Sequence, residues 1–316
     1  MATDFGGAFF YVTLALLLRD LRQCTDMLTF SVRPVLARAV LLTTLTLPMS
    51  LAAQVNPSLQ PIPIDPAWTL VWSDDFNGKA GTQPAETFWN YDIGNEDASG
   101  WGNRELEYYT RDAANVRLDG QGNLEIRALK NTADLWCFNG DACPYTSARL
   151  NTRGKVEAQY GKFEARIQVP AGVGYWPAFW MLGMGEGSWP ANGEIDIMEW
   201  LGRTPTTIYG TLHGPGYAAD KGLSTPHELP QPASNAFHTF TVVKRPDEIV
   251  WLLDGQPYKR VTPQDIPAGT AWVFDRPFYL LLNLAVGGNW SGPVGPKTTF
   301  PGVMKVDYVR IWKAAN

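Results

Sequence analysis

The chain has 316 residues, of which 45% are hydrophobic, 12% aromatic and 18% charged, and its 26 basic and 31 acidic residues give a net charge of −5. The apolar content excludes an intrinsically disordered chain, and the weak, evenly spread charge argues against a nucleic-acid partner. The length suffices for one large domain or two ordinary ones. The 30 glycines and 24 prolines indicate a turn-rich fold, and they lack the regular glycine period of collagen.

Residues 1–53 are expected to lie outside the globular part as a leader with a signal peptide. Residues 8–18 form an apolar run that is too short for a bilayer, which needs about 20 residues. A better export signal follows, with basic residues, an apolar segment and small residues in the expected order: Met27, Arg33, Arg38, residues 39–48 and residues 50–53. We therefore expect Met27 to be the true start and Gln54 to lie near the mature N-terminus; a two-part membrane anchor is the alternative.

Export has consequences for location and for the cysteines. The mature protein is expected to be secreted or periplasmic and monomeric. We expect no membrane span in it, because no later segment is long and apolar enough to cross a bilayer. Cys137 and Cys143 flank a turn-rich loop, and an oxidising compartment favours a disulfide between them. Their spacing does not suit a metal site, and no other Cys or His lies nearby in the sequence. A pair of free thiols is the alternative.

Residues 67–316 are predicted to form a single domain, preceded by an extended, proline-spaced lead-in over residues 54–66. Segments rich in Val, Ile, Phe, Tyr and Trp alternate with turns, and Asp254-Gly255 predicts a tight hairpin. Many short strands without long amphipathic helices favour an all-β antiparallel sandwich over a parallel α/β sheet. The predicted strands include residues 70–76, 123–129, 154–169, 194–201, 237–244, 249–253, 278–284 and 303–313.

Three carboxylates lie close together on one predicted strand: Glu194, Asp196 and Glu199. Strand alternation points Glu194 and Asp196 to one face and turns Glu199 away. An extra residue in a β-bulge around residues 197–198 would return Glu199 to that face. A retaining glycosidase uses two catalytic carboxyl groups about 5–5.5 Å apart. A solvated acidic strand or a calcium cluster is the alternative.

This strand resembles the E-x-D-x-x-E signature of glycoside hydrolase family 16, in the laminarinase-like form with the additional residue. Further segments resemble the same group in the expected order, so that the resemblance extends from Trp68 to Lys313. The segments are residues 70–78, 101–110, 145–152, 175–182, 283–290 and 306–310.

The resemblance implies a concanavalin A-like β-jelly roll of two curved antiparallel sheets, with a glycan-binding cleft across the concave sheet. It implies that Glu194 is the nucleophile, Glu199 the general acid/base and Asp196 the assisting carboxylate, with no cofactor in catalysis. The family's cleft positions map onto residues that can hydrogen-bond sugar hydroxyls or stack on pyranose rings. They are Asn103, Arg149, Trp176, Trp180, His213 and Trp290.

Members of the family often hold one structural cation on the convex side, remote from catalysis. The matching positions here are Asp75, the backbone of Gly122, and Asp307. Oxygen ligands of this kind suit calcium. Asp75 stands where relatives commonly have Glu, so that a shorter side chain must reach the ion. A structural calcium ion is expected on this resemblance alone.

The predicted function is endo-acting hydrolysis of internal β-1,3-glucosidic bonds in laminarin-type β-glucans, so the expected partner is a glucan polysaccharide or oligosaccharide. One alternative is a family member that acts on mixed-linkage 1,3-1,4-glucan, agar or carrageenan. Another is a non-catalytic glycan-binding jelly roll, since fold does not decide function. The intact trio of carboxylates argues against a protein that only binds glycans. The inserted Met198 argues against the lichenase-like branch. The absence of a basic cluster that could bind sulfate favours a neutral glucan as substrate.

Overall fold

The computed structural model describes residues 68–96 and 99–315. The predictions about the leader, the start at Met27 and the lead-in over residues 54–66 therefore fall outside the described residues. Within the described part, no helix has the length and apolar character needed to cross a membrane.

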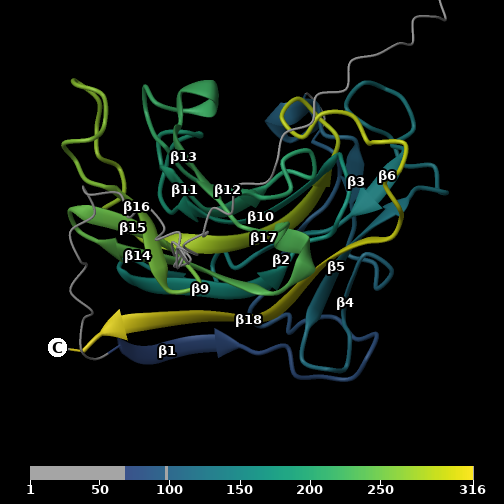
Figure 1. Ribbon diagram of the computed structural model, residues 1–316, viewed down its shortest axis with the longest axis horizontal. Coiled ribbons are helices and arrows are strands. Elements are labelled where there is room, and N and C mark those ends of the chain that lie inside the picture. The colour runs from purple at the N-terminus through teal and green to yellow at the C-terminus, as the bar shows by residue number, and fades with distance from the viewer. Residues whose placement is uncertain (1–67, 97–98, 316) are drawn as a thin grey trace, which may run out of the picture. The chain divides into compact units, whose positions relative to one another are not determined.

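Two layers of strands are stacked on each other (Figure 1). The larger sheet has ten strands, with β16 at one end and β3 at the other. Its pairs are antiparallel except for β3 and β6. Its order is β16 (Gln256–Val261), β15 (Glu248–Leu253), β14 (His238–Arg245), β9 (Gly161–Gln168), β18 (Gly302–Ala314), β5 (Leu124–Lys130), β6 (Tyr145–Ser147) and β3 (Glu107–Tyr109), with β1 (Trp68–Asp74) against β18 and β4 (Val116–Leu118) against β5.

The smaller sheet has eight strands and contains the acidic strand near its middle. Its order is β13 (Leu223–Glu228), β12 (Thr207–His213), β11 (Glu194–Trp200), β10 (Tyr175–Gly183), β17 (Phe278–Val286), β7 (Arg149–Asn151) and β2 (Asn90–Asp92), with β8 (Glu157–Ala158) against β17. Three short helical turns complete the described part: η1 (Gly100–Arg104), η2 (Ala219–Lys221) and η3 (Ala233–Asn235).

The hydrophobic core fills the space between the two sheets. Alternate residues of β9 and β5 are fully buried, as Phe163 and Ile126 illustrate, and they join a cluster with residues of β11 and β17 such as Ile195 and Leu282. The two-residue period of the sequence therefore decides which side chains face the core. The predicted all-β antiparallel sandwich is confirmed.

The hairpin predicted at Asp254-Gly255 joins β15 to β16. Leu253 pairs with Gln256 across it, and Asp254 and Gly255 both have positive φ, at 48° and 76°. Two positive φ values suit the twist of a two-residue hairpin turn. This prediction is confirmed.

Candidate active site

Strand β11 presents its three carboxylates on one face because it contains a bulge. Asp196 and Met198 pair with adjacent residues of β10, so that Ile197 is the extra residue. The register against β12 also shifts between Asp196 and Glu199. Ile197 and Met198 lie in the hydrophobic core, which leaves Glu199 on the same face as Glu194. The bulge predicted around residues 197–198 is confirmed.

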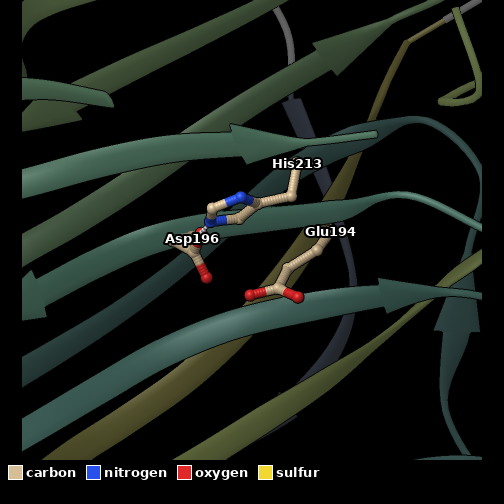
Figure 2. A group of neighbouring side chains, drawn as sticks. All are labelled: Glu194, Asp196 and His213. Carbon is tan, nitrogen blue, oxygen red and sulfur yellow. Dashed lines mark ion pairs between the residues drawn. The ribbon is translucent and has the colours of Figure 1, made fainter. Parts of the chain in front are cut away.

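Glu194 and Asp196 of β11 meet His213 of the neighbouring strand β12 (Figure 2). One oxygen or nitrogen atom of each residue lies within 4.8 Å of the others. Nε2 of His213 is 3.3 Å from Oδ2 of Asp196. Burial lowers the pKa of His213, so the imidazole is neutral near pH 7 and adds no full positive charge beside the carboxyl groups. The group therefore places two carboxyl groups and a neutral imidazole within 4.8 Å of one another.

Burial keeps protons on these carboxyl groups to unusually high pH. It raises the pKa of Asp196 to about 7 and that of Glu194 to about 8, with the Asp196 charge adding to the shift of Glu194. Burial also raises the pKa of Glu199 well above its ordinary value, and the charges of Asp196 and Glu194 act in the same direction. Asp196 and Glu194 share a side-chain hydrogen bond, so the proton of one affects the titration of the other. Burial and the two neighbouring charges therefore favour the protonated form of Glu199.

Two further side chains hold the glutamate oxygens in place. The indole Nε1 of Trp189 donates a hydrogen bond to Oε2 of Glu194 at 2.5 Å. The hydroxyl of Thr211 donates to Oε2 of Glu199 at 3.1 Å. Trp189 is 50% exposed and was not predicted from the sequence. Its position in the loop five residues before Glu194 was the available signal.

Arg149 and Trp180, both predicted cleft residues, are brought together across β7, β17 and β10. The guanidinium of Arg149 lies 4.8 Å from the ring centroid of Trp180 and 4.4 Å from that of Trp101. It also forms an ion pair with Asp92 at 2.9 Å. Its positive charge is therefore neutralised inside the protein, and the stacked rings provide a flat apolar surface.

Trp176 and Trp290, both predicted cleft residues, also contact each other. Their ring centroids lie 5.0 Å apart in an edge-to-face arrangement, and Tyr209 of β12 contacts Trp290 at 5.2 Å. Tyr209 precedes Thr211 on the same face of its strand. It was not predicted from the sequence as a cleft residue.

A buried hydrogen-bond network connects the predicted residues Trp180 and Asn103. Trp180 donates to Asn283 at 2.8 Å, Asn283 to the hydroxyl of Tyr109 at 3.0 Å, and that hydroxyl to Glu105 at 3.2 Å. Asn103 donates to the other oxygen of Glu105 at 3.3 Å. The network fixes two cleft side chains from beneath, and its middle members were not identified from the sequence.

Cys137 and Cys143 form the predicted disulfide, with their Cα atoms 4.9 Å apart. The bond closes a short loop that packs against the segment containing Asn103. The amide of Phe138 in this loop donates to Oδ1 of Asn95 at 2.8 Å, and the guanidinium of Arg104 lies over the Phe138 ring at 5.1 Å. The disulfide thus stabilises the wall that positions Asn103.

The residues expected to bind calcium are not arranged as a cation site. Arg310 donates twice to Oδ1 of Asp75, at 2.7 and 3.1 Å. Arg166 donates to Oδ2 of Asp307 at 2.6 Å. Gly122 lies in a turn with φ of +87°. Because a different guanidinium already neutralises each carboxylate, these donors do not fit a calcium ion, and the expectation from the resemblance is not supported.

Comparison with known proteins places this geometry in a family. The family model of glycosyl hydrolases family 16 matches residues 101–310. The chain belongs to this family. The Beta-glucanase of Rhodothermus marinus is 40% identical over 258 residues, which cover 78% of this chain and 86% of the relative.

Two solved structures extend the likeness to three dimensions. The endo-β-1,3-glucanase of Pyrococcus furiosus is 46% identical with a TM-score of 0.73, covering 79% of this chain and 95% of the other. The laminarinase catalytic domain of Thermotoga maritima is 43% identical with the same TM-score, covering 79% and 99%. The resemblance to the laminarinase-like branch and the jelly-roll fold are confirmed, and this member of family 16 is a glycoside hydrolase.

Proposed function

We propose that the protein is a retaining endo-glycosidase that hydrolyses internal β-1,3-glucosidic bonds of laminarin-type β-glucans. The observation that carries the proposal is the bulge of β11, because it brings Glu194, Asp196 and Glu199 to one face of the sheet. The names of the similar proteins, a β-glucanase and two endo-1,3-β-glucanase or laminarinase structures, support the choice of substrate.

In the first step, a carboxylate oxygen of Glu194 attacks the anomeric carbon while Glu199 gives its proton to the departing glycosidic oxygen. The carbon–oxygen bond of the glucan breaks, and an ester bond to Glu194 forms. Glu199, now ionised, then removes a proton from water, which attacks the same carbon and releases Glu194. Two successive inversions leave the product with the β configuration of the substrate.

The residues around the glutamates prepare each for its role. Trp189 fixes one oxygen of Glu194. Asp196 shares a proton with Glu194, and attack requires that proton to lie on Asp196 so that the nucleophile is ionised. The pKa of Glu199 is raised by burial and by the two neighbouring charges, which favours the protonated form that a general acid requires. The two carboxyl groups alone supply this chemistry, so the mechanism uses no cofactor.

The cleft favours a neutral glucan over a sulfated polysaccharide. Its flat surfaces are indole rings, chiefly Trp176, Trp180 and Trp290, and such rings stack on the apolar faces of pyranoses. The cation over the Trp180 ring is Arg149, whose charge is paired with Asp92. A sulfate group would have to break that ion pair to bind there. Mixed-linkage glucan, which is also neutral, is the closer competitor.

Product analysis tests the proposal. The purified protein is incubated with laminarin, lichenan, agarose and carrageenan, and the released oligosaccharides are identified. We expect internal cleavage of laminarin, with β-anomeric products seen first by proton NMR. Release from agarose or carrageenan alone, or initial α-anomers, would contradict the proposal.

We further propose that the protein is exported and acts as a monomer outside the cytoplasm. The support is the order of basic, apolar and small residues before Gln54. N-terminal sequencing of the secreted product should begin within a few residues of Gln54. A mature protein that retains residues 1–26 would contradict both the export signal and the start at Met27.

A further inference from the structure

Lys259 places an ammonium group in the hydrophobic core behind the catalytic strand. It belongs to β16 of the larger sheet, yet only 6% of the residue is exposed. Its side chain crosses the core to the smaller sheet, where Nζ donates to the carbonyl of Gly210 in β12 at 2.7 Å and to that of Leu223 in β13. A buried ammonium group is costly, so the position calls for an explanation.

The partners of Lys259 lie directly behind two of the active-site carboxyl groups. Nζ is 4.5 Å from the ring centroid of Trp251, and the indole of Trp251 donates to the carbonyl of Asp196 at 2.7 Å. Gly210 is followed in β12 by Thr211, which donates to Glu199. The lysine therefore contacts the supports of both Asp196 and Glu199.

This approach is possible because residue 210 is a glycine. A Cβ at Gly210 would lie 2.6 Å from the hydroxyl of Tyr258 and 2.7 Å from the indole of Trp251. A larger residue would push this layer away from β12. The close packing lets the charge of Lys259 act on the carboxyl groups through the sheet with little water between them.

The electrostatic effect follows from the sign of the charge. The Lys259 charge lowers the pKa of Asp196, against the larger effect of burial. Burial lowers the pKa of Lys259 itself to about 7, against the charges of Asp196 and Glu199. The other titratable groups facing this cluster are Glu194 on β11, His213 on β12, Tyr258 on β16 and His227 on β13, whose ring centroid lies 4.8 Å from that of Tyr258.

We propose that Lys259 is a positioning residue for hydrolysis, and that it supplies from behind the sheet the counter-charge that keeps one carboxylate of the Glu194–Asp196 pair ionised. The proposal rests on the proposed function, because it gives Glu194 the role of a nucleophile that must be ionised. In this proposal Lys259 does not contact the substrate. Lys259 acts on the carboxyl groups through its contacts with Trp251 and Gly210 and through the electrostatic effect of its charge.

The chain offers a matched control in Lys244. This lysine, on β14 of the same larger sheet, is 1% exposed. Its Nζ also donates to two main-chain carbonyls, those of Gln159 and Arg276. Burial lowers its pKa to about 7 as well, but the carboxylate that acts on it is Asp275 and not a catalytic residue. Replacing Lys244 also removes a buried ammonium group and its two hydrogen bonds to main-chain carbonyls. It should leave the electrostatic potential at the carboxyl groups of β11 unchanged.

The experiment compares the pH dependence of kcat/KM for the wild type, Lys259→Met and Lys244→Met on the glucan that the wild type cleaves. We expect the acid limb of Lys259→Met to move to higher pH by about one unit, because the first ionisation of the Glu194–Asp196 pair then lacks the counter-charge that acts on Asp196. The alkaline limb should move less, since Lys259 has already lost much of its charge above pH 7. Lys244→Met should lower the Tm and leave both limbs unchanged.

Unshifted limbs in Lys259→Met, or equal shifts in both variants, would overturn the proposal. Lys259→Gln provides a second variant if the methionine substitution prevents folding, since an amide can still donate to the carbonyl of Gly210. Carbon-13 NMR titration of the side-chain carboxyl groups in this variant makes the test independent of activity. The pKa of the Glu194–Asp196 pair should rise by a similar amount. An unchanged titration would refute the role of Lys259, whereas a wild type that cleaves none of the four polysaccharides would refute the proposed function.

Discussion

The indole nitrogen of Trp189 lies 2.5 Å from Oε2 of Glu194 and donates a hydrogen bond to it. The tryptophan is in the loop before β11, and half of its surface is exposed to solvent. The same residue can therefore hold Glu194, the proposed nucleophile, and offer its ring to a sugar. The ring also contacts His213, with centroids 6.0 Å apart.

Replacing Trp189 with Phe separates these two contributions. The variant keeps an aromatic ring and loses the hydrogen bond to the Glu194 carboxylate, so kcat should fall by about ten-fold or more while KM changes little. Steady-state kinetics on laminarin measures both constants. Trp136→Phe, at a tryptophan that is 63% exposed, is the control and should behave as the wild type. A Trp189→Phe variant with unchanged kcat would show that the hydrogen bond has no role in attack.

Deleting Met198 tests the bulge. The deletion shortens β11 by one residue next to the unpaired Ile197 and so closes the bulge. Glu199 should then turn into the core side of the sheet, and hydrolysis should be lost while the sandwich still folds. Circular dichroism reports the fold, and reducing-sugar release reports hydrolysis. Met198→Leu keeps the length of the strand and fills a similar volume, and it should retain activity. Normal turnover by the deletion variant would contradict the placement of Glu199.

The raised pKa of Glu199 predicts how stability depends on pH. Because its pKa is higher in the folded than in the unfolded protein, the folded state binds more protons above about pH 4.5, and its stability falls as pH rises toward the folded pKa. Glu199→Gln removes this effect. Its Tm should match that of the wild type near pH 4 and exceed it increasingly from pH 5 to 8, as measured by calorimetry.

The control for this measurement is Glu186→Gln, at an exposed position in the loop before β11. Its Tm should follow that of the wild type at every pH. A Glu199→Gln variant whose Tm difference from the wild type does not grow with pH would contradict the protonated state assigned to Glu199.

Treatment with a calcium chelator should leave the thermal stability of the protein unchanged. Asp75 and Asp307 are each bound by an arginine, so EDTA followed by added calcium should not shift the Tm in a thermal melt. Asp75→Asn should cost at most about 1 kcal/mol, because the Asp75–Arg310 pair is partly exposed to solvent. A chelator-dependent loss of several degrees in Tm would restore the calcium site expected from the family.

The fold and the catalytic strand could be predicted because both follow from local patterns. The two-residue period defined the strands, Asp254-Gly255 defined a hairpin, and three carboxylates at that spacing required a bulge. The remaining features depend on contacts between distant segments. Trp189 reaches Glu194 through the conformation of its loop, and Lys259 is buried because the opposite sheet covers it.

The calcium expectation was not supported for the same physical reason. Whether Asp75 faces a cation or Arg310 is decided by the pairing of β1 with β18. That pairing joins residues more than 200 positions apart, and a motif at either end contains no information about the other.

The most direct test of the account is azide rescue of two variants, Glu194→Ala and Glu199→Gln, on an activated aryl β-glycoside whose leaving group departs without protonation. Glu199→Gln should form the glycosyl-enzyme on Glu194 and stall, and azide should then attack it and give the β-azide. Glu194→Ala has no nucleophile and leaves an open space in its place, so azide should enter that space and give the α-azide. Proton NMR of the glycosyl azides distinguishes the two results. The reverse stereochemistry would exchange the two roles, and full hydrolysis by both variants would contradict the assignment of the catalytic residues.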